Sequence, residues 1–372
     1  MSPSELDEKT ERLQRMLGRE NLGGVLLNAQ HNFAWLTGGG SNGIDLSREN
    51  GAAYLLVRSD GKRFVLANNI EMPRLLAEEI SADDFEPLEF SWQGEKASGN
   101  FVMEKAKALL TSGDIATDIV IETATRAVEG KIAGCRYSLT ADETERYRIH
   151  GRDSGKAMRN VIASLTPGES EIEIAEKLRH EFAKAGMVSV VTLIAADERI
   201  AQFRHPVPTE KRWEKTVMLV TCAKRRGLIT SLSRIVCIGE VPGELKQKTE
   251  AAAYVNASLM DASRPGTTGA ELYKIAADAY AARDFASELN HHHQGGAAGY
   301  KTREWVAHPE STEIVQSNQA FAWNPSITGT KVEETCIAGK NGVEVITASP
   351  DFPQIATTVH GHEYFSPGIL SL

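Results

Sequence analysis

The sequence predicts an α+β protein of two domains, a small N-terminal α/β domain over residues 1–139 and a larger C-terminal domain over residues 140–372. The chain has 372 residues, enough for about two domains. Short helical and strand-like segments mix before residue 140. After it, two long helical segments, three apolar strand-like segments and two more helical segments follow in turn. These later helices are expected to flank a predominantly antiparallel sheet.

The first domain opens with a charged amphipathic segment, Glu5 to Glu20, which predicts a helix. Apolar runs over Gly23 to Ala29 and Ala52 to Asn69 predict strands, and the second run contains a turn at Asp60-Gly61 that divides it in two. The remaining predicted elements are helices over residues 72–80 and 100–110 and a strand over Asp118 to Thr123.

The second domain opens with a long helical segment from Ala141. Pro167-Gly168 separates it from a second helix, for which Ser170 is the expected cap because acidic residues follow in the first turn. The other predicted elements are strands over residues 188–196, 216–225 and 227–239 and helices over residues 246–263 and 268–283.

Composition excludes several kinds of partner. The chain carries 50 acidic and 41 basic residues, a formal net charge of −9, and no lysine- or arginine-rich run, so no nucleic-acid partner is expected. Residues 1–17 are too charged for a signal peptide, and no later stretch approaches about 18 consecutive apolar residues. We therefore expect a cytoplasmic protein with no membrane partner. The four cysteines contain no CxxC motif, which favours buried reduced thiols.

Several motifs follow one another from about residue 30 to the C-terminus, namely NFAWLTG (residues 32–38), FRHPVPTEKRWEKTVMLV (203–220), HHHQGGAAGYKTREW (291–305) and KVEET (331–335). Together they resemble the creatinase, prolidase and aminopeptidase P family. The resemblance implies a creatinase-type N-terminal domain and a pita-bread C-terminal domain. It also implies a homodimer in which the loop from Gly38 to Asp45 approaches the catalytic pocket of the other subunit.

The resemblance also shows where metal ligands are missing. Peptidases of this family bind two divalent metals through two aspartates, a histidine and two glutamates, because bridging carboxylates hold the ions about 3.5 to 4 Å apart around a nucleophilic water. Four of the five positions carry other residues here: Val220 (or Thr221, if one residue is deleted in the turn), Ser231, Gly296 and Asn324. Only Glu333 is of a ligand type. We therefore expect no bound metal and no other cofactor.

The residues that remain resemble creatinase, the branch of the family that dispenses with metal. By that resemblance His205, His292 and Glu333 are the catalytic residues, and the two histidines act as acid-base groups, since imidazole titrates near neutral pH. Arg303 would bind a substrate carboxylate through its planar fork of donors. The expected substrate site is completed by Asn324, which can hydrogen-bond an amide or carbonyl, and by His293 and Trp323.

The expected reaction is hydrolysis or elimination at a C–N or related bond of a small anionic substrate. Creatine itself is disfavoured, because the two glutamates that would hold its cationic end map to Ser233 and Asn324. Two alternatives stay open. One is a catalytically inactive ligand-binding protein. The other is an Xaa-Pro metallopeptidase with a metal site rebuilt from His205, His292, His293, Glu333 and Glu334.

Overall fold

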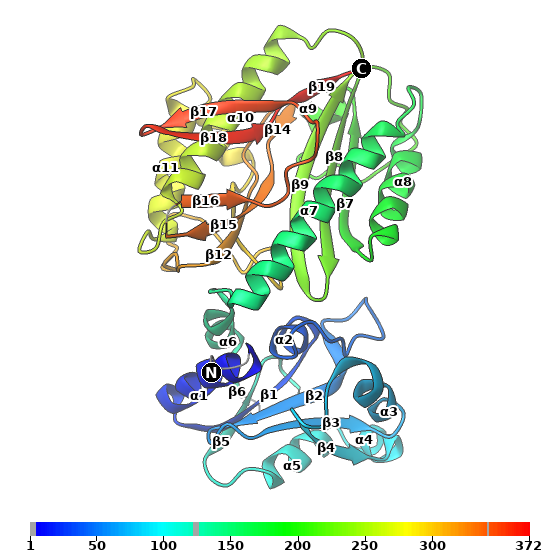
Figure 1. The fold of residues 1–372 in the computed structure, drawn as a ribbon, viewed down its shortest axis with the longest axis vertical. Coiled ribbons are helices and arrows are strands. Elements are labelled where there is room, and N and C mark those ends of the chain that lie inside the picture. The colour runs from blue at the N-terminus through cyan, green and yellow to red at the C-terminus, as the bar shows by residue number, and fades with distance from the viewer. Residues whose placement is uncertain (1–4, 122–125, 341) are drawn as a thin grey trace. The chain divides into compact units, whose positions relative to one another are not determined.

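The structure is a computed structural model that describes residues 5–121, 126–340 and 342–372. The chain forms two compact units, Met1–Arg136 and Tyr137–Leu372 (Figure 1). The predicted boundary after residue 139 lies just inside the second unit. Each unit combines helices with sheets, so the predicted α+β class with two domains is confirmed.

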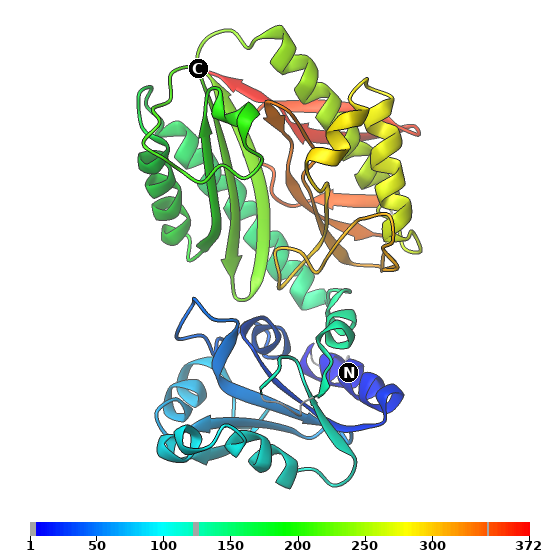
Figure 2. The same ribbon diagram turned by 180° about the vertical axis from the view of Figure 1, so that it is seen from behind.

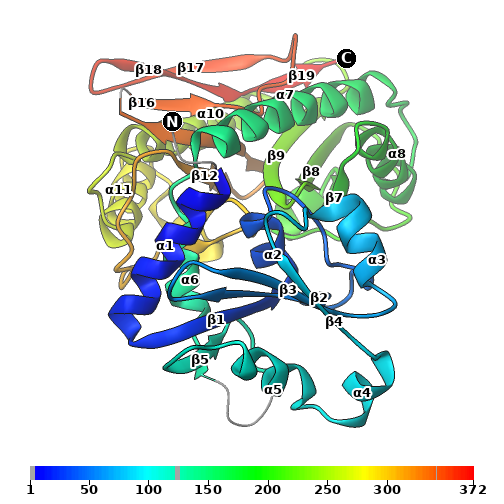
Figure 3. The ribbon, with the colours of Figure 1, turned by 60° about the horizontal axis from the view of Figure 1, so that its bottom comes forward.

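The N-terminal unit is built on a sheet whose described strands lie in the order β4-β3-β2-β1-β5-β6. The central strand β1 (Leu22–Ala29) is completely buried, because helices cover both of its faces. The other strands are β2 (Asn50–Arg58), β3 (Arg63–Asn68), β4 (Glu86–Phe90), β5 (Asp114–Thr117) and β6 (Arg126–Ala127). The helices are α1 (Glu5–Glu20), α2 (Gln30–Leu36), α3 (Met72–Arg74), η1 (Leu75–Glu79), α4 (Trp92–Ala97), α5 (Phe101–Ala108) and α6 (Glu129–Arg136). Helices α1 and α6 lie side by side (Figure 3).

One strand of this unit was predicted in the wrong place. The strand lies at β5, and residues 118–121 continue beyond it without strand structure. The Asp118 carboxylate accepts hydrogen bonds from the backbone N–H groups of Asn28 and Ala29, at 3.0 and 2.8 Å. If the strand continued, its backbone carbonyls would accept hydrogen bonds from these N–H groups of β1. The Asp118 carboxylate accepts them instead, so the strand ends. The end of the predicted segment, residues 122 and 123, lies outside the described residues.

The C-terminal unit begins with two helices, α7 (Ala141–Ala163) and α8 (Glu171–Lys184), that pack on one side of the sheet β19-β9-β8-β7. Each helix starts with a reciprocal capping box, Thr140 with Glu143 and Ser170 with Glu173, so the predicted Ser170 cap is confirmed. The strands are β7 (Val188–Ala196), β8 (Thr216–Arg225), β9 (Leu228–Cys237) and β19 (Ile369–Ser371).

A second sheet, in the order β11-β10-β12-β15-β16, packs against α10 (Gly243–Ala262) and α11 (Gly269–Ala281), which lie away from α7 and α8 (Figure 2). Its strands are β10 (Gly295–Ala298), β11 (Trp305–Val306), β12 (Gln319–Trp323), β15 (Glu334–Gly339) and β16 (Gly342–Val345). Two hairpins complete the unit, β13 (Ser326–Ile327) with β14 (Thr330–Lys331) and β17 (Gln354–Val359) with β18 (His362–Pro367).

The two sheets of this unit meet along β9 and the start of β15. The backbone N–H of Ser231 donates to Thr335 Oγ1 at 2.7 Å, and that of Ser233 donates to the Glu333 carbonyl at 3.2 Å. Side chains from both sheets therefore come close together at this junction. All four cysteines are buried, and none of the described helices has the length and apolar composition needed to cross a membrane.

His150 on α7 makes the stability of this unit depend on pH. Its side chain is 1% exposed, and burial lowers its pKa from 6.5 to about 4. Between pH 6.5 and about 4, His150 is protonated in the unfolded chain and neutral in the folded chain. The folded state therefore loses stability as the pH falls through this range. We expect the free energy of unfolding to drop by up to about 3 kcal/mol across that window on account of this residue.

Denaturant titrations between pH 7 and pH 4 would measure this effect in the wild type and in His150→Gln. Glutamine keeps a donor for the Ala223 carbonyl, which His150 Nε2 contacts at 2.9 Å, but it does not titrate. The variant should lose most of the pH dependence that His150 contributes. His180→Gln, on the exposed surface of α8, is the matched control and should change nothing. Equal pH dependence in wild type and His150→Gln would contradict this account.

Candidate active site

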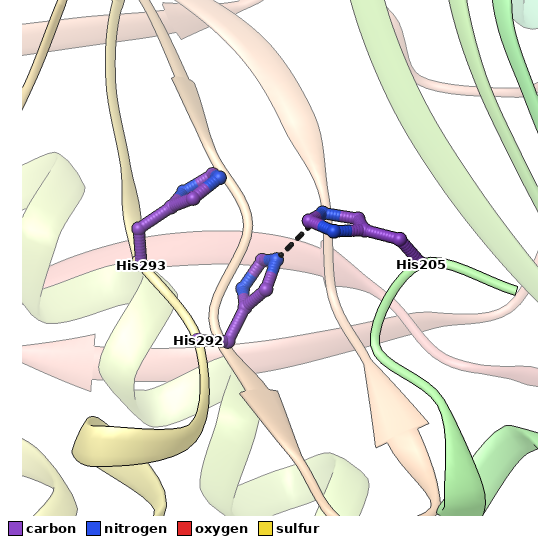
Figure 4. A group of neighbouring side chains, drawn as sticks. All are labelled: His205, His292 and His293. Atoms are coloured by element: carbon purple, nitrogen blue, oxygen red, sulfur yellow. Dashed lines mark hydrogen bonds between the residues drawn. The ribbon is translucent and has the colours of Figure 1, made fainter.

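Three histidines meet in the C-terminal unit (Figure 4). His205 follows the short helix α9 (Arg199–Gln202), and His292 and His293 directly follow the 3-10 helix η2 (Ala286–His291). The Nε2 atoms of His205 and His292 are 3.2 Å apart, within hydrogen-bond distance. The His292 ring also stacks on that of His293, with centroids 4.4 Å apart. The structure thus brings together all three predicted histidines.

The environment keeps these three imidazoles neutral at neutral pH. Partial burial is the main cause that lowers the pKa of each ring, of which those of His205 and His293 remain exposed, and the positive charge of Lys331 contributes in all three cases. The pKa of His292 falls to about 2, and that of His293, which also lies near Arg303, falls to about 4. A neutral imidazole presents one N–H donor and one nitrogen lone pair, so each ring is able to ligate a metal, whereas the low pKa of His292 makes that ring a weak proton acceptor in the free protein.

Arg303 and Glu333 form an ion pair in the same region. Arg303, between β10 and β11, donates from Nη2 to Glu333 Oε1 at 3.3 Å, and Ser233 donates from Oγ to Glu333 Oε2 at 2.6 Å. Glu333 is 2% exposed and the Arg303 side chain 13%, so this is not a surface pair. Both charges influence the pKa of His205 and of His293, which places the pair beside the histidines.

Asn324, directly after β12, lies next to the histidine segment because its backbone N–H donates to the Gln294 carbonyl at 3.0 Å. Its side chain is 4% exposed, and its Oδ1 atom is buried without a hydrogen-bond partner. Two further buried atoms of this region lack partners, His292 Nδ1 and Arg303 Nε. Buried polar groups of native proteins are nearly always paired, so these three atoms are candidates for hydrogen bonds to a ligand.

Trp323 does not belong to this group, and the expectation that it lines the substrate site is corrected. Its side chain is fully buried, stacks on Phe321 and donates from Nε1 to Ser263 Oγ at 3.0 Å. Trp323 therefore lies in the hydrophobic core beneath α10. The physical reason is strand alternation, which turns successive side chains of a strand to opposite faces, so that Trp323 and Asn324 diverge.

Sequence reasoning missed Lys331. This side chain is 5% exposed, and the pKa values of all three histidines respond to its charge. A signal was present in the sequence. Lys331 stands two positions before Glu333 in a strand-like segment, where residues two apart share a face.

The structure shows the surroundings of three residues that the family resemblance assigns to metal-ligand positions, Gly296, Val220 and Thr221. A Cβ atom at Gly296 would lie 2.0 Å from the Trp305 carbonyl oxygen, so a histidine does not fit there without moving the backbone. Thr221 points to the side of the sheet that α7 and α8 cover, and it contacts Ser189 Oγ at 2.8 Å. Val220 lies on the opposite side, so Val220 rather than Thr221 occupies the position next to the site.

The three histidines are nevertheless able to hold a metal ion, since one ring nitrogen from each lies within 4.8 Å of the others. Two imidazoles on a tetrahedral zinc ion have their nitrogens about 3.3 Å apart, close to the separation of His205 and His292. The positive charges of Lys331 and Arg303 oppose a divalent cation here. Glu334, expected in a rebuilt metal site, instead pairs with Arg234 at 2.8 Å.

Comparison with known proteins places this arrangement in a family. Residues 145–346, more than half of the chain, match the metallopeptidase family M24, and residues 9–124 match the creatinase/prolidase N-terminal domain. This chain belongs to metallopeptidase family M24. The predicted family and the pita-bread fold of the C-terminal unit are thereby confirmed.

This M24 chain is 22% identical over 360 residues to the uncharacterized peptidase YqhT of Bacillus subtilis strain 168, covering 92% of this chain and 98% of the relative. It is 25% identical over 202 residues to an Xaa-Pro dipeptidase of Pyrococcus horikoshii, covering 52% and 57% of the two chains. The prolidase structure from Pyrococcus horikoshii OT3 superposes with a TM-score of 0.76 at 19% identity, covering 92% and 98%. At that identity the structural likeness establishes the fold alone.

Proposed function

We propose that this M24 protein is a metal-independent hydrolase that cleaves a C–N or related bond of a small anionic molecule. The observation that carries the proposal is the contact between the neutral rings of His205 and His292, beside the Arg303–Glu333 pair. A pair of neutral imidazoles can take a proton from an attacking water and return it to a leaving nitrogen. Arg303 supplies a fork of donors for a substrate carboxylate.

The charges around the histidines favour an anionic substrate. Lys331 and Arg303 lower the pKa of His205 and His293 in the free protein. A bound carboxylate offsets those positive charges and so raises the pKa of both rings, because a nearby negative charge favours the imidazolium form. The histidines therefore become stronger bases when substrate is bound, which couples proton uptake to the presence of the correct ligand.

A second candidate retains metal-assisted hydrolysis of the kind that the family name describes. The convergence of His205, His292 and His293 favours it, since three histidines with an open fourth position make a common catalytic zinc site. In this reading His293 is as important as the other two histidines. In the metal-independent reading His293 packs on His292 and contributes less to the reaction.

Metal analysis combined with a substrate screen separates the two candidates. The purified protein would be assayed, before and after treatment with a chelator, against small carboxylates such as Xaa-Pro dipeptides, N-acyl amino acids and guanidino acids. We expect turnover of one of these classes that the chelator does not affect and a metal content far below one ion per chain. A stoichiometric metal whose removal abolishes turnover would establish the second candidate. Ligand binding without turnover of any class would overturn both.

The homodimer implied by the family resemblance stays a prediction.

A further inference from the structure

Lys331 is a buried residue whose charge lowers the pKa of all three histidines. On β14 its neighbours face the other way: Thr330 Oγ1 contacts Thr249 of α10 at 2.8 Å, and Val332 is fully buried in the core beneath α10 and α11. Because Thr330 and Val332 on either side of it face α10 and the core, Lys331 faces away from them. Among the described residues, the partners that act on its ammonium group do so through charge, without a hydrogen bond.

Among the described residues, no carboxylate pairs with Lys331 alone, and burial lowers the pKa of its ammonium group. Burying an ammonium group costs several kcal/mol unless a carboxylate pairs with it. The carboxylate that acts on Lys331 is Glu333, which already accepts hydrogen bonds from Arg303 and Ser233. Arg204, the other nearby cation, is paired with Glu288. Lys331 and Arg303 thus share one carboxylate and leave one positive charge in excess, in a protein whose net charge is −9.

Two unpaired polar atoms in the same region indicate which functional groups a ligand would need. Arg303 Nε is a buried donor without an acceptor, and Asn324 Oδ1 is a buried acceptor without a donor. A carboxylate would satisfy the donors, and an amide N–H or hydroxyl on the same molecule would satisfy Asn324. The site is therefore complementary to one negative charge together with one hydrogen-bond donor.

We propose that Lys331 is a second cationic anchor of this site and that, with Arg303, it selects small monocarboxylates that also carry an amide or hydroxyl donor. This inference rests on the proposed function in assigning the site to a small anion, and it adds the residue that sets the charge of the ligand. Lys331 would contact the ligand carboxylate directly. Asn324 would distinguish N-acyl or hydroxy acids from plain carboxylates.

Equilibrium binding tests this inference without requiring turnover. The probes are N-acetylglycine, a monocarboxylate with an amide N–H, and its neutral amide, N-acetylglycinamide, each titrated by calorimetry. The wild type should bind the acid saturably and the amide at least about tenfold more weakly. Lys331→Met should weaken binding of the acid by roughly tenfold to a hundredfold, whereas Lys331→Arg should retain it within about threefold. Lys340→Met, at an exposed position of the same unit, is the matched control.

A thermal melt of Lys331→Met separates a ligand-binding role from a structural one. If the lysine is kept for a ligand, methionine removes an unbalanced buried charge while Glu333 keeps Arg303 and Ser233, so the melting temperature should rise or stay the same. A lower melting temperature with unchanged affinity for N-acetylglycine would assign Lys331 to stability and overturn the proposal. Should Lys331→Met fail to fold, equal binding of the acid and its neutral amide by the wild type would overturn it as well.

The outcomes also separate this inference from the proposed function. Lys331-dependent binding of N-acetylglycine, without hydrolysis of any tested carboxylate, would support the anion site and count against the hydrolase. Chelator-resistant turnover of a neutral or cationic substrate, with no affinity for N-acetylglycine, would support metal-independent hydrolysis but refute both the anionic substrate and Lys331 as an anion anchor.

Discussion

Replacing His205 or His292 by alanine is expected to lower the turnover number for the substrate identified in the screen by about 10²- to 10⁴-fold, the usual contribution of general acid-base catalysis. The two imidazole nitrogens are 3.2 Å apart, so each ring depends on the other for its hydrogen bond and its tautomer. The two losses should therefore not add. The double variant should be about as slow as the slower single variant. Steady-state kinetics on purified variants with matched melting temperatures would measure the effect.

Two neighbouring histidines serve as controls for this prediction. His291→Ala alters the same histidine run outside the cluster, where His291 is exposed and lies 3.5 Å from Glu288, and it should leave turnover unchanged. His293→Ala should lower turnover only modestly in the metal-independent reaction. If His293→Ala is as damaging as the other two variants and also abolishes metal binding, the zinc candidate is supported. Unchanged turnover in His205→Ala and His292→Ala would exclude both mechanisms.

Replacing Arg234 by methionine is expected to destabilise the C-terminal unit by about 3 to 5 kcal/mol, a large part of the total stability of a typical domain. Arg234 is 1% exposed and lies 2.8 Å from the carboxylate of Glu334, which is itself 2% exposed. It also donates to the carbonyls of Ser233 and Thr347, at 2.7 and 2.9 Å. The substitution would leave Glu334 charged, buried and without its cation. Burial already raises the pKa of Glu334.

Denaturant unfolding of three variants would test this expectation. Arg234→Met combined with Glu334→Leu should recover part of the loss, because removing both charges leaves no uncompensated carboxylate. Arg148→Met is the matched control. It breaks an ion pair of similar length, 2.7 Å to Glu344, whose side chains are 46% and 48% exposed, and it should cost less than about 1 kcal/mol. A loss for Arg234→Met no larger than that of Arg148→Met would contradict the role assigned to the buried pair.

Much of the fold followed from local sequence patterns. The helix α1 was predicted with its observed limits, and the Ser170 cap was identified from the acids that follow it. Such features depend on residues a few positions apart, so their physical causes are present in the sequence itself. The strand predicted over residues 118–123 failed for the opposite reason. The Asp118 carboxylate bonds to backbone groups of β1, some ninety residues away in the chain, and no local pattern shows this contact.

The candidate site was foreseen in part. His205, His292, His293, Arg303 and Glu333 were predicted and lie together in the structure. Trp323 was assigned to the site but packs in the core, while Lys331 was overlooked although it influences all three histidines. An aromatic side chain next to a site residue suits a core and a binding surface equally well. The direction in which each side chain points is decided by the sheet to which its strand belongs.

By itself, the sequence determined the family and the order of the elements, because these depend on residue identity and spacing along the chain. The tertiary structure decided which side chains meet. It placed two histidine nitrogens 3.2 Å apart, paired Glu334 with Arg234, and buried Lys331. The physical reason is that burial and charge pairing arise between segments far apart in sequence. Only the packing of the sheets determines which buried charges lie next to an opposite charge and which do not.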